Sequence, residues 1–149
     1  MCDYCDCRSH SEIASLSDDH ETFGHMLDQL MRAVETDDRH AAAAVAAELH
    51  PLLDGHAARE ERGVFTQLRH AHVSDGYVAR FERDHQAVHA LLDDRDERGW
   101  HERARELIHV LGDHIAREES DLFPAAHQLL TPAQWDAVDA ASAVGAHAA

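Results

Sequence analysis

The sequence predicts an all-α fold: an antiparallel up-down four-helix bundle with a short additional C-terminal helix. Composition supports the helical class, because 44% of the 149 residues are apolar, only 5% are aromatic, and glycine and proline are scarce. A chain of this length has enough mass for one sizeable core. Four segments of similar length carry apolar residues at helical spacing and are separated by short polar stretches, which favours a bundle.

Start and stop signals give the expected bounds of the helices. Ser17 is the expected N-cap of the first helix because acidic residues follow it, and Ser74 is the expected cap of the third. Pro51 predicts a kink or a late start in the second helix, and Pro124 predicts a bend in the fourth. The four long helices are expected at residues 17–35, 39–70, 75–94 and 100–130.

The last part of the chain contains a strong helix start. Thr131 is followed by Pro132 and then Gln134, which matches an N-cap, a proline at the first helical position and a glutamine that closes the cap. A short fifth helix is therefore predicted. The expected organisation is a cysteine-rich tail at residues 1–16, the bundle at residues 17–130, and a C-terminal helix and tail at residues 131–149.

The charge of the chain argues against several classes of partner. Its formal net charge is -16, so nucleic acids and anionic membrane surfaces would repel it. No apolar run is long enough to span a bilayer, and the N-terminus has no signal-peptide pattern. We therefore expect a cytoplasmic protein that binds neither nucleic acid nor membrane. The 15 histidines, several times the usual fraction, indicate a specific role for imidazole.

A polar decapeptide occurs twice in the chain. The first repeat, HAAREERGVF at residues 56–65, and the second repeat, HIAREESDLF at residues 114–123, are identical at six of ten positions. An Asp-His dipeptide, at residues 19–20 and again at residues 84–85, lies one predicted helix before each repeat. The bundle is therefore expected to consist of two helix pairs related by an approximate two-fold axis.

Helical periodicity places one histidine of each long helix among the apolar residues that face inward. The second and fourth helices add a glutamate one turn later. His25, His50 and His109 are expected to point away from these faces. The predicted inward faces are His20, Phe23, Leu27, Leu30 and Val34; Leu49, Leu52, His56, Glu60 and Val64; Val78, Phe81, His85, Val88 and Leu92, with His89 nearby; and Leu107, Leu111, His114, Glu118 and Leu122.

These inward polar residues predict a metal site. Burying a carboxylate in an apolar bundle costs several kcal/mol unless it is paired or binds a metal. Residues four apart on a helix project side by side, so each H-x-x-x-E pair offers one nitrogen and one oxygen to the same region. Imidazole with carboxylate suits iron, manganese or zinc, and seven ligands suit two octahedral ions bridged by carboxylates. The predicted ligands are His20, His56, Glu60, His85, His89, His114 and Glu118.

The sequence resembles the hemerythrin-like, or HHE cation-binding, domain family over residues 17–130. The resemblance rests on the first Asp-His dipeptide and on the segments HAAREE, DHQAVH and HIAREE. It implies an antiparallel four-helix bundle that holds two non-haem iron ions, with an oxo or hydroxo bridge and two bridging carboxylates.

The resemblance also implies a role for each predicted ligand. In the oxygen carriers of the family an aspartate lies five residues after the last histidine, a place that Glu119 occupies here, so Glu119 is the reserve for Glu118. Many HHE domains use only one histidine where this chain has His85 and His89. The implied set is His85, His89 and His114 on one iron, His20 and His56 on the other, and Glu60 and Glu118 as bridges. The iron bound by His20 and His56 would keep one open position for dioxygen, peroxide or nitric oxide.

Other metal motifs fit the chain less well. Ferritin-like bundles use Glu-x-x-His, the reverse of the order here, and the segment HQAVH lacks the glutamate of a zincin. The remaining repeated residues have simpler interpretations: the arginines pair with neighbouring acids, the second glutamates lie outside the ligand set, and the phenylalanines close the core. These residues are Arg59 and Arg117, Glu61 and Glu119, and Phe65 and Phe123.

The N-terminal segment has a separate cluster with the pattern C-x-x-C-x-C-x-x-H. Its residues are Cys2, Cys5, Cys7 and His10. In a reducing cytosol this spacing is consistent with a zinc site, with a redox-active dithiol, or with a flexible tail of ordinary thiols.

Three functions are consistent with a di-iron centre of this kind. The first is turnover of peroxide or nitric oxide in oxidative or nitrosative stress, with catalase-like peroxide disproportionation as the leading activity. The second is reversible binding or sensing of dioxygen or nitric oxide. The third is iron homeostasis, with occupancy of the centre as the signal. A carrier needs a tight apolar pocket, whereas turnover needs access and a source of protons.

Overall fold

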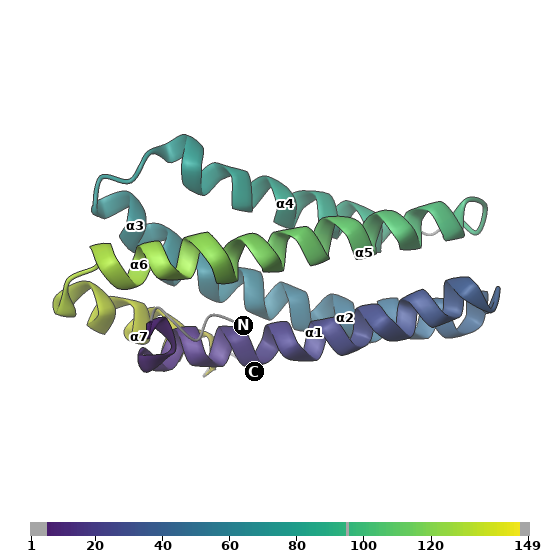
Figure 1. The fold of residues 1–149 in the computed structure, drawn as a ribbon, viewed down its shortest axis with the longest axis horizontal. Helices are drawn as coiled ribbons and strands as arrows, with labels where there is room; N and C mark the ends of the chain where they lie inside the picture. Colours follow the sequence, from purple (N-terminus) through teal and green to yellow (C-terminus); the bar gives the residue numbers. More distant parts are fainter. Residues whose placement is uncertain (1–5, 95, 147–149) are drawn as a thin grey trace.

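The structure, a computed structural model, describes residues 6–94 and 96–146, and every regular element within these ranges is a helix (Figure 1). The all-α prediction is therefore confirmed. The four long helices are α1 (Ser11–Glu35), α2 (Arg39–Glu60), α4 (Asp75–Asp93) and α5 (Trp100–Arg117). The other helices are α3 (Thr66–His70), α6 (Phe123–Leu129), α7 (Pro132–Ala146) and the 3-10 turn η1 (Cys7–Ser9).

The long helices lie side by side in two pairs. A short turn joins α1 to α2, and a loop joins α4 to α5, so the members of each pair run in opposite directions (Figure 1). The pairs meet where α1 packs on α5 and α2 packs on α4. The shorter helices α3, α6 and α7 lie at the end of the molecule opposite to these two connections (Figure 1).

Two long helices continue through a π-helical segment into a shorter helix. α2 passes through η2 (Glu61–Phe65) into α3, and α5 passes through η3 (Glu118–Leu122) into α6. The predicted helices at residues 39–70 and 100–130 therefore match continuous helical stretches. Pro51 lies inside α2, which begins at Arg39, so it does not mark a late start. Pro124 lies in the first turn of α6, directly after η3.

Two local predictions were wrong. Ser17 is not an N-cap, because α1 already begins at Ser11 and the fully buried Ser17 lies inside it. The apolar stripe of α1 extends back through Ile13 and Leu16, which favours a helix two turns longer. Leu52 does not face inward: it is 45% exposed, whereas the next residue is buried. The remaining predicted inward residues are buried except His89, whose side chain is 33% exposed, and His25 and His109 are exposed as expected.

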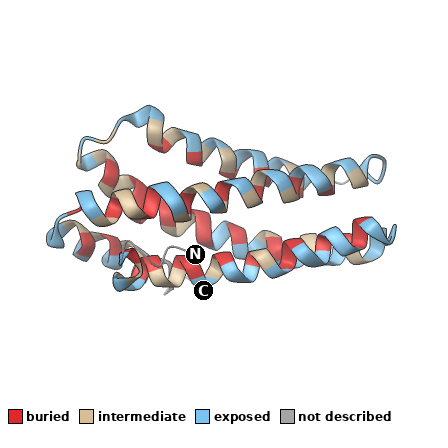
Figure 2. Ribbon diagram, viewed as in Figure 1, coloured by how far each residue is buried: buried red, intermediate tan, exposed pale blue. Residues whose placement is uncertain are grey.

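The core consists of two apolar clusters with a polar layer between them. One cluster, around Leu16, Phe65 and Val138, lies towards α7, and the other, around Phe23 and Leu107, lies towards the α1–α2 turn. Figure 2 shows the buried residues along the facing sides of the long helices. The buried polar layer comprises His20, His56, Glu60, His85, His114 and Glu118.

α7 begins with the predicted cap. The backbone nitrogen of Gln134 donates to the Thr131 hydroxyl at 3.3 Å, and the Gln134 side-chain oxygen accepts from the Thr131 backbone nitrogen at 3.0 Å. Trp135 and Val138 then bury α7 against the core cluster at this end. Within the part of the chain that the structure describes, no helix combines the length and apolar character needed to cross a membrane.

Candidate metal centre

The two H-x-x-x-E pairs project into the polar layer as the helical spacing predicts. In the first repeat, Nε2 of His56 lies 3.1 Å from Oε1 of Glu60, and in the second, Nε2 of His114 lies 3.1 Å from Oε1 of Glu118. Each histidine lies four residues before its glutamate, so the two side chains point from the same face of the helix. The repeats thus bring two nitrogen–oxygen pairs into the interior from α2 and α5.

Each glutamate is shared between two histidines on different helices. Oε1 of Glu60 faces His56, while its Oε2 lies 3.1 Å from Nε2 of His85. Oε1 of Glu118 faces the histidine of its own repeat, while its Oε2 lies 3.1 Å from Nε2 of His20. Every oxygen of the two carboxylates therefore faces a different imidazole.

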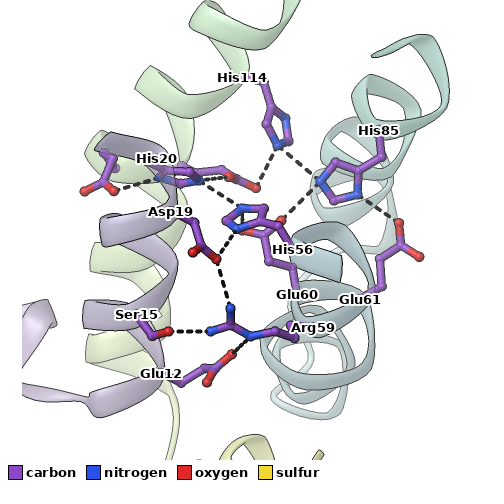
Figure 3. Close-up of polar contacts among 12 residues, drawn as sticks. Glu12, Ser15, Asp19, His20, His56, Arg59, Glu60, Glu61, His85 and His114 are labelled. Carbon is purple, nitrogen blue, oxygen red and sulfur yellow. Dashed lines mark hydrogen bonds and ion pairs between the residues drawn. The ribbon is translucent and has the colours of Figure 1, made fainter. Parts of the chain in front are cut away.

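The shared carboxylates define two groups of potential metal ligands. The imidazoles of the first group, His20 and His56, approach to 3.1 Å between their Nε2 atoms, and those of the second, His85 and His114, approach to 3.2 Å. Figure 3 shows the four rings converging from separate helices. The first group is His20, His56, Glu60 and Glu118, and the second is Glu60, His85, His114 and Glu118.

Burial makes a cation the natural partner of these groups. Glu60 and Glu118 are 0% exposed, and although an imidazole nitrogen lies 3.1 Å from each of their four oxygens, none of these contacts among the described residues has the geometry of a hydrogen bond. A buried carboxylate without such partners is costly unless a positive charge compensates it. A pair of metal ions between the imidazoles and carboxylates would satisfy all four oxygens.

The distances between the donor atoms also fit metal ions. Ligands about 2.0–2.2 Å from one ion lie about 2.8–3.1 Å apart at right angles, but about 3.3–3.6 Å apart at tetrahedral angles. Three separations between donor atoms of the first group are each 3.1 Å, and three in the second group are 3.1, 3.1 and 3.2 Å. The donor atoms of each group are therefore close enough together to bind one ion in common.

A second carboxylate holds the other nitrogen of every imidazole. Nδ1 of His20 donates to Glu119 at 2.8 Å, and Nδ1 of His85 donates to Glu61 at 2.8 Å. These bonds fix the orientation of the ring and leave Nε2 free to bind a metal. The remaining pairs are His56 with Asp19, at 3.1 Å, and His114 with Asp84, at 3.2 Å.

These outer contacts repeat the two-fold pattern of the sequence. The aspartate of each Asp-His dipeptide accepts from the histidine of a repeat, and the histidine of each dipeptide donates to the second glutamate of a repeat. Successive glutamates therefore contact both nitrogens of one ring, as Glu60 and Glu61 do for His85. The π-helical segments begin at Glu61 and Glu118, where a wider turn reduces the divergence of consecutive side chains.

The repeated arginines support the outer aspartates. Arg59 donates to Asp19 at 2.9 Å, to Glu12 at 3.0 Å and to Ser15 at 2.8 Å, as Figure 3 shows. Arg117 donates to Asp84 at 2.6 Å. The expected pairing of these arginines with acids is therefore observed. The arginines connect the outer aspartates to the surface of the helices.

The repeated phenylalanines pack directly on two of the imidazoles. Phe123 stacks on His20 with ring centroids 5.5 Å apart and planes at 7°, and Phe65 stacks on His85 at 5.6 Å and 10°. Both phenylalanines are fully buried, in agreement with their predicted place in the core. They also limit the rotation of the rings that they cover.

The electrostatics of the site favour positive charge. Burial alone would lower the pKa of His56, but Glu60 and Asp19 outweigh it and raise this pKa to about 10. Burial likewise opposes protonation of His85, whose pKa Glu60 and Glu61 raise to about 9. The imidazoles in turn hold the pKa of Glu60 well below its usual value despite its burial. In the absence of metal, the same carboxylates therefore retain protons on His56 and His85.

Two predicted ligands lie outside the groups. Glu119, the reserve for Glu118, contacts Nδ1 of His20. His89 lies one turn beyond His85, its Nδ1 atom 3.1 Å from Asp54, and the structure brings it into neither group. The extra turn displaces His89 along the helix axis from the layer of ligands.

The structure describes only part of the N-terminal cysteine cluster. Cys2 and Cys5 lie outside the described residues, and Cys7 is buried in the core cluster near α7. His10 lies 3.1 Å from His127 and stacks on Trp135 at 3.7 Å. The zinc, redox and flexible-tail alternatives for this cluster all stay predictions.

Comparison with known proteins identifies the class. The fold and the site define a helical protein with two buried groups of potential metal ligands. Residues 10–126 match the family model described as the hemerythrin HHE cation-binding domain, and the chain therefore belongs to this family. This confirms the resemblance drawn from the motifs. No curated protein and no solved structure gives a significant match to the chain.

Proposed function

We propose that this protein is a non-haem di-iron protein that binds or reacts with dioxygen, peroxide or nitric oxide, on the up-down four-helix topology of its family. The observation that supports this most strongly is the sharing of Glu60 and Glu118, each of which directs one oxygen to each pair of imidazoles. Imidazole and carboxylate together suit iron, and two shared carboxylates suit two neighbouring ions. Membership of the HHE family supports a cation as the cofactor.

The residues of the two groups would hold the irons. His20 and His56 would bind one ion and His85 and His114 the other, through the Nε2 atoms that face Glu60 and Glu118. The outer carboxylates keep the proton of each ring on Nδ1, so that Nε2 presents its lone pair. When bound, two irons supply the electron transfer that oxygen species require.

A small cavity adjoins the imidazoles and limits the size of the ligand. It measures about 10 Å³, which is room for about one water-sized molecule. Phe23 and Leu53 line this cavity. Phe23 lies three residues after His20 on α1, and Leu53 lies three residues before His56 on α2, so the cavity is on the side of the imidazoles away from the glutamates. The lining comprises His20, Phe23, Leu53, His56, Ala57, His85, Val88, His89, Leu111, His114 and Ile115. The size of this space favours a small ligand over a bulky substrate.

Catalase-like turnover is the leading activity within this proposal. Two molecules of hydrogen peroxide would yield one dioxygen and two water molecules with no net uptake of protons, so the site needs groups that accept protons from one peroxide and return them to the other. Glu61 supports this requirement, because its side chain is 44% exposed and accepts a hydrogen bond from Nδ1 of His85. The carboxylate thus connects an inner imidazole to the surface.

Reversible binding without turnover is the second candidate. The apolar side chains of Phe23, Leu53 and Leu111 on the cavity wall favour it, because such walls exclude water and protons. Addition of peroxide to the iron-loaded protein, with dioxygen release recorded, separates the two. Release over many turnovers per chain supports the enzyme. A spectral change without sustained release supports the binding protein and contradicts turnover.

A further inference from the structure

A second repeated motif lies outside the candidate metal centre. Residues 50–54 of α2 read HPLLD and residues 89–93 of α4 read HALLD, identical at four of five positions. The second leucine of each motif is buried, Leu53 and Leu92 each being 5% exposed. The same leucine of each motif is thus packed in the core. The histidine and the aspartate of each motif therefore lie at corresponding positions on their helices, nearer the protein surface.

The two motifs pair reciprocally across the helices. His89 of α4 places Nδ1 3.1 Å from Oδ1 of Asp54 on α2, and His50 of α2 places Nε2 3.4 Å from Oδ1 of Asp93 on α4. His50 also lies 3.8 Å from Asp54 of its own motif. Each histidine therefore faces the aspartate of the other motif, and two imidazoles and two carboxylates gather at one place between the helices.

This arrangement has the chemistry of a metal site. One ligand atom from each of His50, Asp54 and His89 lies within 4.8 Å of the others, and Asp93 adjoins them. Two imidazoles with carboxylates suit zinc or another divalent first-row transition metal. The side chains are 24% exposed for His50 and 33% for His89, so an ion from solvent reaches them directly.

The position of this cluster relates it to the buried centre. His89 takes part in the cluster and also lines the cavity beside the four inner imidazoles. One residue thus lies both at the partly exposed cluster and at the edge of the buried groups. The net charge of -16 attracts cations to the protein surface in general, and the cluster offers them ligands at this edge.

We propose that the two H-x-L-L-D motifs form an outer site for a divalent transition metal ion, where iron(II) docks before it enters the buried centre. The binding of an ion at His50, Asp54, His89 and Asp93 is independent of the proposed function. The role in entry rests on the proposed di-iron centre.

The outer site is tested with zinc on the iron-loaded protein. The variant His50→Ala/Asp93→Asn changes two residues that belong to neither inner group, and the control His25→Ala/Asp28→Asn makes the same changes on the exposed face of α1. We expect calorimetric titration to show one zinc ion bound per chain in the wild type and the control, with at least tenfold weaker binding in the variant. Equal zinc affinity in all three proteins would overturn the outer site. If the inner groups hold no iron, zinc also occupies them, and the outer site is then the zinc ion that the control binds and the variant loses.

The entry role is tested by the rate of metal uptake. Metal-depleted wild type, variant and control are mixed with iron(II) under anaerobic conditions, and the iron bound to protein is measured over time. We expect at least tenfold slower uptake by the variant, with the same final iron content in all three. A variant that loses zinc binding but takes up iron at the wild-type rate would overturn the entry role. Matching thermal unfolding of the metal-depleted proteins establishes that the variant is folded.

Discussion

The carboxylate of Asp19 accepts a hydrogen bond from Nδ1 of His56 at 3.1 Å, although the two residues lie on different helices. Asp19 directly precedes His20, the other imidazole of the same group. One dipeptide of α1 therefore supplies a potential ligand and also orients its partner on α2. The second Asp-His dipeptide, on α4, has the same relation to the imidazole on α5.

Asp19→Asn should weaken metal binding without unfolding the protein. An amide still accepts a hydrogen bond, but it carries no charge to raise the basicity of His56, and the loss of such a partner costs about 10–100-fold in metal affinity. Competition with a chelator measures this affinity. The control is Asp18→Asn, a change at the neighbouring exposed residue. Equal affinities in the two variants would show that the outer carboxylate does not act on the centre.

Glu60→Gln should reduce occupancy of both ion positions together. Because its two oxygens face imidazoles of different groups, loss of the charge affects both. We expect less than one iron per chain by elemental analysis, whereas His20→Ala, which alters only one group, should retain about one. Glu48→Gln, at an exposed position of the same helix, should retain the wild-type content. If Glu60→Gln kept a full second ion, Glu60 would not be shared.

His114→Ala should lower both metal content and thermal stability, since metal binding and folding are linked. Metal present at 100 times its dissociation constant stabilises the folded state by about 2.7 kcal/mol, which corresponds to about 5–10 °C in a domain of this size. Calorimetry of the loaded proteins measures the shift. His109→Ala, an exposed position on the same helix, should change neither quantity. Loss of iron in that control would contradict the assigned helix faces.

The metal-depleted protein should become less stable as the pH rises above neutrality. The pKa is raised from 6.5 to about 10 for His56 and to about 9 for His85. A raised pKa contributes stability that is complete below about pH 6.5, the unfolded value, and is lost as the pH rises through the folded value. Denaturant unfolding at pH 6, 8 and 10 should therefore give falling free energies.

The iron-loaded protein is the control for this pH dependence. Ions on the Nε2 atoms take the place of protons, so its stability should change less over the same pH range. A metal-depleted protein as stable at pH 10 as at pH 6 would show that its imidazoles do not hold these protons.

Periodicity alone predicted most of the fold, because the helices bury a regular stripe. Its errors arose where a local signal outweighed the longer pattern. Ser17 precedes acidic residues and suits a cap, yet Ile13 and Leu16 continue the stripe and extend α1 to Ser11. Leu52 and Leu53 are both apolar, and only the geometry of packing decides which of two adjacent leucines is buried.

The arrangement of the site was less accessible from the sequence. The helical periodicity of the apolar residues predicted that Glu60 and Glu118 face inward. The supporting role of Asp19 depends on contacts between helices, which the spacing of residues in the sequence does not determine. The repeated Asp-His dipeptide is the available signal; in the sequence it indicates symmetry and the family resemblance, but not that its aspartate orients an imidazole on another helix. His89 shares a face with His85, but the side chain of Asp54 on a neighbouring helix engages it.

Elemental analysis of the purified iron-loaded protein, together with its optical spectrum, tests the central claim most directly. We predict about two iron ions per chain and the absorption of an oxygen-bridged iron pair. About one zinc ion per chain with a featureless spectrum would contradict the account.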